Sequence, residues 1–148
     1  MNNAKKRKVK DVAKNSSKNS KFGKLLYRIV QFYKPQNILE LGTSLGISTL
    51  YLAKAEETSK VHTFEGCLET IKIAKQNFNK LDAKNIAITS GDFQNTLQKK
   101  LKEITTIDLA FIDGNHQEQP TITYFKECLK YANNDTIFIF DDIHWSKG

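Results

Sequence analysis

The feature that most constrains the fold is a regular alternation between short apolar runs and longer amphipathic runs. Five runs are predicted strands: Asn37–Leu41, Val61–Phe64, Ile86–Thr89, Ile107–Ile112 and Thr136–Phe140. Strands alternating with helices at this spacing are typical of repeated βαβ units, and parallel strands covered on both faces appear as nearly continuous apolar runs. The sequence therefore predicts an α/β fold: a Rossmann-like, doubly wound parallel sheet of five strands with flanking helices.

The amphipathic runs place apolar residues every three or four positions, so each predicted helix buries one stripe. The predicted stripes are Phe22/Leu25/Leu26/Ile29/Tyr33, Ile47/Leu50/Tyr51, Ile71/Ala74/Phe78/Leu81, Phe93/Leu97/Leu101/Ile104 and Ile122/Phe125/Leu129/Ala132. The first helix is predicted to begin at Ser20 and to stop before Pro35, a length of about 14 residues. We therefore divide the chain into a lysine-rich tail, residues 1–19, and one domain, residues 20–148.

The formal net charge of +7 is concentrated at the start of the chain. Residues 1–24 hold nine of the 23 Lys/Arg residues and one of the 16 Asp/Glu residues, so the rest carries 14 basic and 15 acidic residues. Because the chain after residue 24 is nearly neutral, a basic groove for nucleic acid is not expected in the domain. Only weak, salt-sensitive contacts through the lysine-rich tail are expected. The run KKRKVK at 5–10 also resembles a nuclear-import signal, but we favour a solvated tail.

Neither a membrane segment nor a cysteine-based site is predicted. No apolar run approaches the roughly 20 residues that cross a bilayer, and no apolar stretch follows the lysine-rich start. We therefore expect a soluble, cytoplasmic protein without a membrane partner. Cys67 and Cys128 stand outside any CxxC or Cys/His cluster, which argues against a zinc site or a disulfide framework.

Carboxylates lie at or just after the ends of the predicted strands, where an open parallel sheet binds its ligands. After the first strand, Gly42-Thr43-Ser44-Leu45-Gly46 forms a tight turn into a helix, which lets backbone N–H groups approach a ligand. The spacing is neither the dinucleotide G-x-G-x-x-G nor a Walker loop. Glu65 ends the second strand, where it is placed to accept hydrogen bonds from a ribose diol. The glycine-containing turn after the first strand and Glu65 after the second together predict an adenosine-containing cofactor.

Five segments in order resemble class I S-adenosylmethionine-dependent methyltransferases of the O-methyltransferase-like kind. They are ILELGTSLGISTLYLA (38–53), VHTFEG (61–66), SGDF (90–93), IDLAFIDGNH (107–116) and IFIFDDIHW (137–145). The resemblance implies methyl transfer from S-adenosylmethionine to a hydroxyl of a small-molecule acceptor. It places Glu40, Gly42, Thr43, Ser44, Gly46 and Ser48 at the methionine end of the cofactor. It also places Glu65 with Gly66 at the ribose, Asp92 with Phe93 at the adenine, and Asp113 among the cofactor-binding residues at the same edge of the sheet. Ser44 stands where many relatives carry a glycine.

The resemblance to catechol-type members also implies a magnesium site. It assigns Mg²⁺ to Asp113, Asp141 and Asp142, and the general base to His116. Clustered carboxylates suit a hard cation that holds an acceptor hydroxyl and lowers its pKa. The alternatives stay open: acids at strand ends also cap helices, and His116 could cap the helix predicted to start near Pro120. His144 and Trp145 either line an acceptor pocket or form a turn, and His62 within a strand is predicted to be structural.

The complete family fold has two more strands after the fifth, and this sequence stops at Gly148. We therefore expect an incomplete methyltransferase domain whose strand Thr136–Phe140 lies at an open edge, a known route to self-association and hence to a homo-oligomer. Two other functions are considered. An NAD(P)-dependent oxidoreductase has the wrong glycine spacing, and a non-catalytic binding module would use the basic tail to contact nucleic acid.

Overall fold

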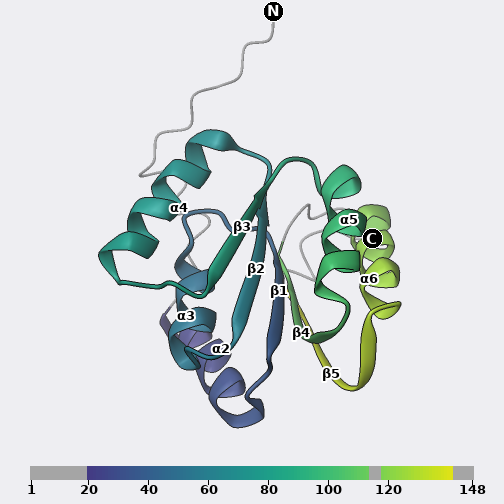
Figure 1. Cartoon of the computed structure of the whole chain (residues 1–148), viewed down its shortest axis with the longest axis horizontal. Coiled ribbons are helices and arrows are strands. Elements are labelled where there is room, and N and C mark those ends of the chain that lie inside the picture. The colour runs from purple at the N-terminus through teal and green to yellow at the C-terminus, as the bar shows by residue number, and fades with distance from the viewer. Residues whose placement is uncertain (1–19, 114–117, 142–148) are drawn as a thin grey trace, which may run out of the picture.

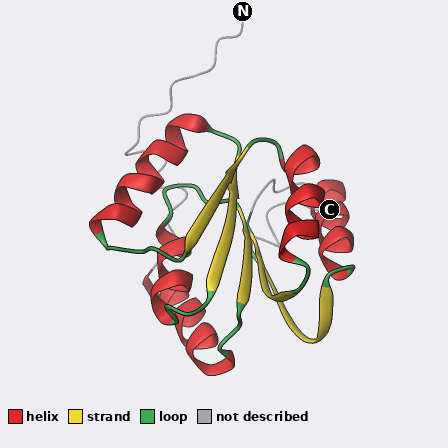
Figure 2. Ribbon diagram, viewed as in Figure 1, coloured by secondary structure: helices red, strands yellow, loops and turns green. Residues whose placement is uncertain are grey.

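The computed structural model describes residues 20–113 and 118–141, which form one parallel sheet with helices on both faces (Figure 1, Figure 2). In chain order the elements are α2 (Ser20–Tyr33), β1 (Asn37–Leu41), α3 (Ile47–Ala55), β2 (Lys60–Glu65), α4 (Leu68–Lys80), β3 (Ile86–Ser90), α5 (Phe93–Ile104), β4 (Ile107–Ile112), α6 (Glu118–Leu129) and β5 (Ala132–Phe140). The predicted class, a five-stranded Rossmann-like α/β sheet, is confirmed.

The strand order is β3-β2-β1-β4-β5, and every neighbouring pair is parallel. The chain runs outward from β1 through β2 to β3 and then crosses back to place β4 on the other side of β1. Ile38 at the centre of the sheet therefore pairs with Val61 of β2 and Leu109 of β4. The order reverses between β1 and β4, and this is the point beyond whose carboxyl ends an open α/β sheet binds its ligand.

Alternate residues of the central strands enter two separate hydrophobic clusters. One cluster comprises Leu26, Val30, Ile38, Leu52, Ala53, Val61, Leu109 and Phe111; the other comprises Leu39, Leu41, Phe64, Leu97, Leu101, Ile104, Ile107, Ala110, Ile112, Tyr124 and Cys128. We call the two sides of the sheet the α3 face, covered by α2, α3 and α4, and the α5 face, covered by α5 and α6 (Figure 1). Because both faces are buried, β1 and β4 appear in the sequence as nearly continuous apolar runs, interrupted after the first residue of each strand only by Glu40 and Asp108.

The predicted bounds hold for β1 and β4, whereas β5 begins earlier than predicted. The register between β4 and β5 shifts, since Ile107 pairs with Ala132 while Leu109 pairs with Ile137. Thr136 Oγ1 donates a hydrogen bond to the Ile107 carbonyl across this irregular stretch (2.6 Å). The added residues include exposed polar side chains, so the apolar pattern did not mark them as a strand.

The predicted stripe is only partly right for α6: Phe125 is partly buried and packs against the α5-face cluster as predicted. Tyr124 and Cys128 form its buried side, whereas Ile122 and Leu129 are exposed. Tyr124 and Cys128 lie four positions apart, so one side of the helix presents both to the cluster on the α5 face. Ala132, the last residue of the predicted stripe, lies in β5.

The α2 helix has its predicted bounds, but its stripe is only partly right. Leu26 is buried together with Val30, while Leu25 and Tyr33 are exposed. In α3 the buried positions include Ser48 and Thr49, because this helix presents hydroxyls to a carboxyl group in β1.

No helix in the described part of the chain is long and apolar enough to cross a bilayer. Within the same residues both cysteines are free thiols, Cys67 exposed and Cys128 buried. Burial raises the pKa of Cys128 to about 12, so this thiol stays protonated at neutral pH.

Candidate functional site

The ends of the five strands meet at one edge of the sheet, joined by backbone hydrogen bonds. The N–H groups of Gly42 and Thr43 both donate to the Phe64 carbonyl (3.1 and 2.9 Å). Beyond β4 and β5, Asp113 N–H donates to Leu41 O (2.9 Å) and Asp141 N–H to Ile112 O (3.1 Å). The residues predicted from strand ends are therefore brought to a common edge.

The turn after β1 depends on backbone conformations that favour glycine. Gly42 and Gly46 have φ values of 105° and 79°, and Ser44 between them has φ of 48°. A Cβ at Gly46 would lie 2.4 Å from the ring of Phe78, so this position needs glycine both for its conformation and for space. Gly46 is also the N-cap of α3 and supplies no side-chain bond, which leaves the first N–H groups of the helix for a ligand.

Glu65 at the end of β2 is held against this turn. Its Oε2 accepts a hydrogen bond from Ser44 N–H and its Oε1 accepts one from Cys67 N–H, each at 2.9 Å. The turn and the acid thus lie at one rim, as expected from the sequence. A carboxylate oxygen has two lone pairs, so each oxygen retains the capacity to accept a hydroxyl of a diol.

Glu40 lies beneath the turn, completely buried, in a network of hydroxyl groups. Ser48 Oγ donates to its Oε1 (2.6 Å), and Thr49 and Thr63 donate to its Oε2 (2.5 and 2.6 Å). Thr43 Oγ1 lies 2.6 Å from Thr63 Oγ1, so the network joins the turn, β1, β2 and α3. Burial raises the pKa of Glu40 to about 7; the three hydroxyls oppose this shift and Asp113 adds to it.

Sequence patterns missed Thr49 and Thr63, two of the three hydroxyl donors to Glu40. Thr63 is the polar residue directly opposite Glu40 in the parallel register of β1 and β2. A polar residue on each of two neighbouring apolar strands was the available signal, but it depends on knowing that register.

The residues predicted to flank an adenine have structural roles as well. Asp92 is the exposed N-cap of α5, where its side chain accepts a hydrogen bond from Gln94 N–H (3.0 Å). Phe93 is half-buried, with its ring edge-on to Phe64 and Tyr124 at centroid distances of 6.3 and 5.6 Å. Both follow β3 at the carboxyl edge of the sheet, and exposed Gly66 follows β2 at the same edge.

The predicted metal ligands lie only partly within the described residues. Asp113 and Asp141 each come directly after one of two paired strands, β4 and β5. Asp142 and the predicted base His116 lie outside the described residues, as do His144 and Trp145. Among residues 20–113 and 118–141, no group of three or more His, Cys, Asp or Glu side chains could hold a metal ion, so the three-aspartate site stays a prediction.

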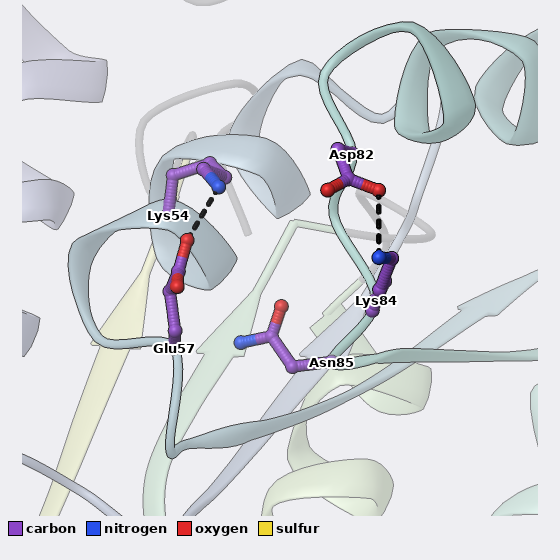
Figure 3. Close-up of a pocket in the computed structure, with 5 residues that line it drawn as sticks. All are labelled: Lys54, Glu57, Asp82, Lys84 and Asn85. Carbon is purple, nitrogen blue, oxygen red and sulfur yellow. Dashed lines mark hydrogen bonds and ion pairs between the residues drawn. The ribbon is translucent and has the colours of Figure 1, made fainter.

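A pocket of about 410 Å³ lies at the opposite edge of the sheet, near the start of β3 (Figure 3). Its four charged side chains pair with one another, Lys54 with Glu57 at 2.6 Å and Lys84 with Asp82 at 3.2 Å. Asn85 Nδ2 donates to three backbone carbonyls. The polar groups of this pocket are therefore already engaged, whereas no side chain caps the first N–H groups of α3 at the carboxyl edge.

Comparison with known proteins identifies relatives of the same fold. A family model described as a methyltransferase domain matches residues 39–143. The catechol O-methyltransferase of Niastella koreensis is 27% identical over 124 residues, covering 82% of this chain and 55% of that protein. The O-methyltransferase from Bacillus cereus in complex with S-adenosylhomocysteine has a TM-score of 0.78 at 25% identity, covering 89% of this chain and 64% of that one. A methyltransferase of Podospora anserina bound to S-adenosylhomocysteine has a TM-score of 0.78 at 21% identity, covering 90% and 59%.

This chain therefore spans between 55% and 64% of the length of these three relatives. The family match bears out the resemblance drawn from the five sequence segments and does not favour the oxidoreductase or the non-catalytic module. The matched residues include the turn, Glu65, Asp113 and Asp141. On that match, the chain belongs to the methyltransferase-domain family.

Proposed function

We propose that this domain binds S-adenosylmethionine and transfers its methyl group to a hydroxyl of a small molecule. One observation carries the proposal: the hydrogen bond from Ser44 N–H to Glu65 Oε2 joins the glycine turn, which follows β1 beside the reversal of strand order, to the acid at the end of β2. The relatives support the same function, since two are bound to S-adenosylhomocysteine and one is a catechol O-methyltransferase.

The chain's own groups suit the two ends of this cofactor. The Glu65 carboxylate has acceptor capacity for both ribose hydroxyls. The uncapped start of α3 offers backbone N–H groups and the positive end of the helix dipole to the cofactor's carboxylate. Asp92 and Phe93 at the neighbouring strand end would flank the adenine.

Bound S-adenosylmethionine supplies an electrophilic methyl group on a sulfonium sulfur. The domain's task is to hold the acceptor oxygen in line with that methyl group and to exclude water. Asp113, Asp141 and Asp142 would hold Mg²⁺, whose role is to bind the acceptor hydroxyl and lower its pKa. The fit rests on the oxygen donors of Asp113 and Asp141 after adjacent strands. His116 would accept the hydroxyl proton.

Cofactor binding is tested by thermal shift and by calorimetric titration with S-adenosylhomocysteine. Ligand at 100 times its Kd should raise the free energy of unfolding by about 2.7 kcal/mol. Glu65→Ala should weaken binding at least about tenfold, because hydrogen bonds to a charged group contribute about 1.5–3 kcal/mol each. Asp82→Ala, an exposed acid at the opposite edge, is the matched control. A folded protein with no ligand response would contradict the proposal.

The magnesium part has a separate test. Methyl transfer to catechol as a probe acceptor should be lost on adding EDTA and restored by Mg²⁺, while S-adenosylhomocysteine binding persists. Asp141→Asn should reproduce the loss of transfer with retained cofactor binding. Transfer that is indifferent to EDTA would remove the metal from the proposal and leave cofactor binding intact.

A further inference from the structure

The buried carboxyl of Glu40 has no cationic partner in the described part of the chain. Its hydrogen-bond partners are the hydroxyls of Ser48, Thr49 and Thr63. The elements packed around it present one other charged group that acts on it, Asp113 after β4, which is itself acidic. A fully buried carboxylate without a counter-charge is costly, and the usual outcome is that the group takes up a proton.

The hydroxyl network can accommodate either protonation state. When Glu40 is ionised, all three hydroxyls donate to it, and Thr43 must then donate to Thr63, whose single proton is already used. When Glu40 is protonated, it donates to one of these hydroxyls, which turns its own proton elsewhere. A rotation of hydroxyl groups is enough to change between the two states, so no backbone movement is required.

The network lies directly under the surface proposed for the methionine end of the cofactor. Glu40 is two residues before Gly42, and Ser48 is in the first turn of α3. S-adenosylmethionine carries an α-ammonium and a sulfonium against one α-carboxylate, so it has one net positive charge, whereas S-adenosylhomocysteine is a zwitterion without net charge. A positive charge at this position favours the ionised carboxyl.

We propose that binding of the cationic cofactor displaces a proton from the buried Glu40 carboxyl into solvent, so that cofactor affinity rises with pH around neutrality. This inference rests on the proposed function. The protonated carboxyl becomes a carboxylate whose charge is offset by the net positive charge of the bound ligand, and the proton passes to the buffer. A pKa of about 7 for Glu40 means that both forms are present in the ligand-free protein at neutral pH.

The test is calorimetric titration with S-adenosylmethionine in buffers of different ionisation enthalpy, which counts the protons exchanged on binding; S-adenosylhomocysteine, which lacks the net positive charge, should release fewer. At pH 7 the wild-type protein should release about half a proton per ligand, and its affinity should rise about tenfold between pH 6 and pH 8. Binding without proton release would overturn the inference while leaving the proposed function intact. No binding at any pH between 5.5 and 8.5 would overturn both.

Two variants assign the proton to Glu40. Glu40→Gln should abolish proton release, and release that persists in this variant would overturn the inference. Thr63→Val removes one hydroxyl that lowers the pKa of Glu40, so it should move the midpoint of the affinity profile to higher pH, and an unmoved midpoint counts against the inference even if Glu40→Gln does not fold. Glu65→Gln is the control: it should weaken binding at every pH without changing the proton count.

Discussion

Among the described residues, the strands of the sheet bury one ionisable side chain on each face, and the surroundings of these two side chains differ sharply. Glu40 of β1 on the α3 face accepts three hydrogen bonds. His62 of β2 pairs in register with Leu39 of the α5-face cluster, and its Nδ1 is buried without a hydrogen-bond partner in the described structure. On the α3 face the buried carboxyl is thus satisfied by hydrogen bonds near the carboxyl edge of the sheet, whereas on the α5 face the imidazole Nδ1 has no hydrogen-bond partner among the described residues.

Burial shifts the pKa values of these two side chains in opposite directions. It raises the pKa of Glu40 to about 7 and lowers the pKa of His62 to about 4, the latter with smaller contributions from Lys100 and Lys60. In each case the neutral form is favoured in the folded state.

The largest effect is expected on the α3 face at Gly46. Gly46→Ala must adopt a positive φ and place its Cβ against Phe78, which should cost about 2–5 kcal/mol in the free energy of unfolding and weaken S-adenosylhomocysteine binding. Gly66→Ala is the matched control, because the nearest atom to its Cβ would be 3.9 Å away. Equal destabilisation of both variants, measured by urea unfolding, would show that the tight fit is not specific to this turn.

The next effect is in the dependence of stability on pH. The raised pKa of Glu40 gives stability that is present below about pH 4.5 and is lost as pH rises through about 7. The lowered pKa of His62 gives stability that is present above about pH 6.5 and is lost as pH falls through about 4. Between pH 4.5 and 6.5 the two contributions oppose each other, each with a slope of at most about 1.4 kcal/mol per pH unit.

Single variants should separate these slopes. Relative to the wild-type protein, Glu40→Gln should become more stable as pH rises across this window, and His62→Leu should become less stable. Unfolding free energies measured from pH 4 to 8 give both differences and cancel the titration of the surface carboxylates common to all three proteins. Parallel curves for all three would mean that neither buried group is perturbed as described.

The sequence predicted the fold well because each strand of a doubly wound sheet is apolar on both faces, a property visible in NILEL and IDLAFI without any tertiary information. It failed where burial depends on a partner element. The exposed side chains of Ile122 and Leu129 have the same spacing as a buried stripe, and the polar residues Asn133–Asp135 hide the start of β5.

The candidate site was predictable to the extent that it follows strand ends. Glu65 and the turn were found because the carboxyl ends of parallel strands share one edge, and their mutual hydrogen bond agrees with that expectation. The network around Glu40 was not found as a network, because it needs the β1–β2 register and the rotation of α3. The roles of His116 and Asp142 stay predictions, since both lie outside the described residues.

A smaller effect is expected from a single hydroxyl of the network. Thr63→Val keeps the shape of the side chain but removes a donor to Glu40 and the partner of Thr43, so it should cost about 1–3 kcal/mol at pH 7. Thr89→Val in β3 is the control, because Thr89 is half-buried and its side chain makes no hydrogen bond in the described structure. Chemical denaturation should show a lower free energy of unfolding for Thr63→Val and an unchanged one for Thr89→Val.

The smallest change in the free energy of unfolding is expected at His62, and this substitution tests the contrast between the two faces most directly. Replacing a buried polar group that lacks a partner by an apolar side chain removes a desolvation cost, so His62→Leu should lie within about 1 kcal/mol of the wild-type protein at pH 7. Glu40→Leu is the matched change on the α3 face, and it should be clearly destabilising because it leaves three hydroxyl donors without their acceptor. If both variants lose the same unfolding free energy at pH 7, the imidazole contributes to the fold as strongly as the carboxyl. The proposed difference between the two faces would then be wrong.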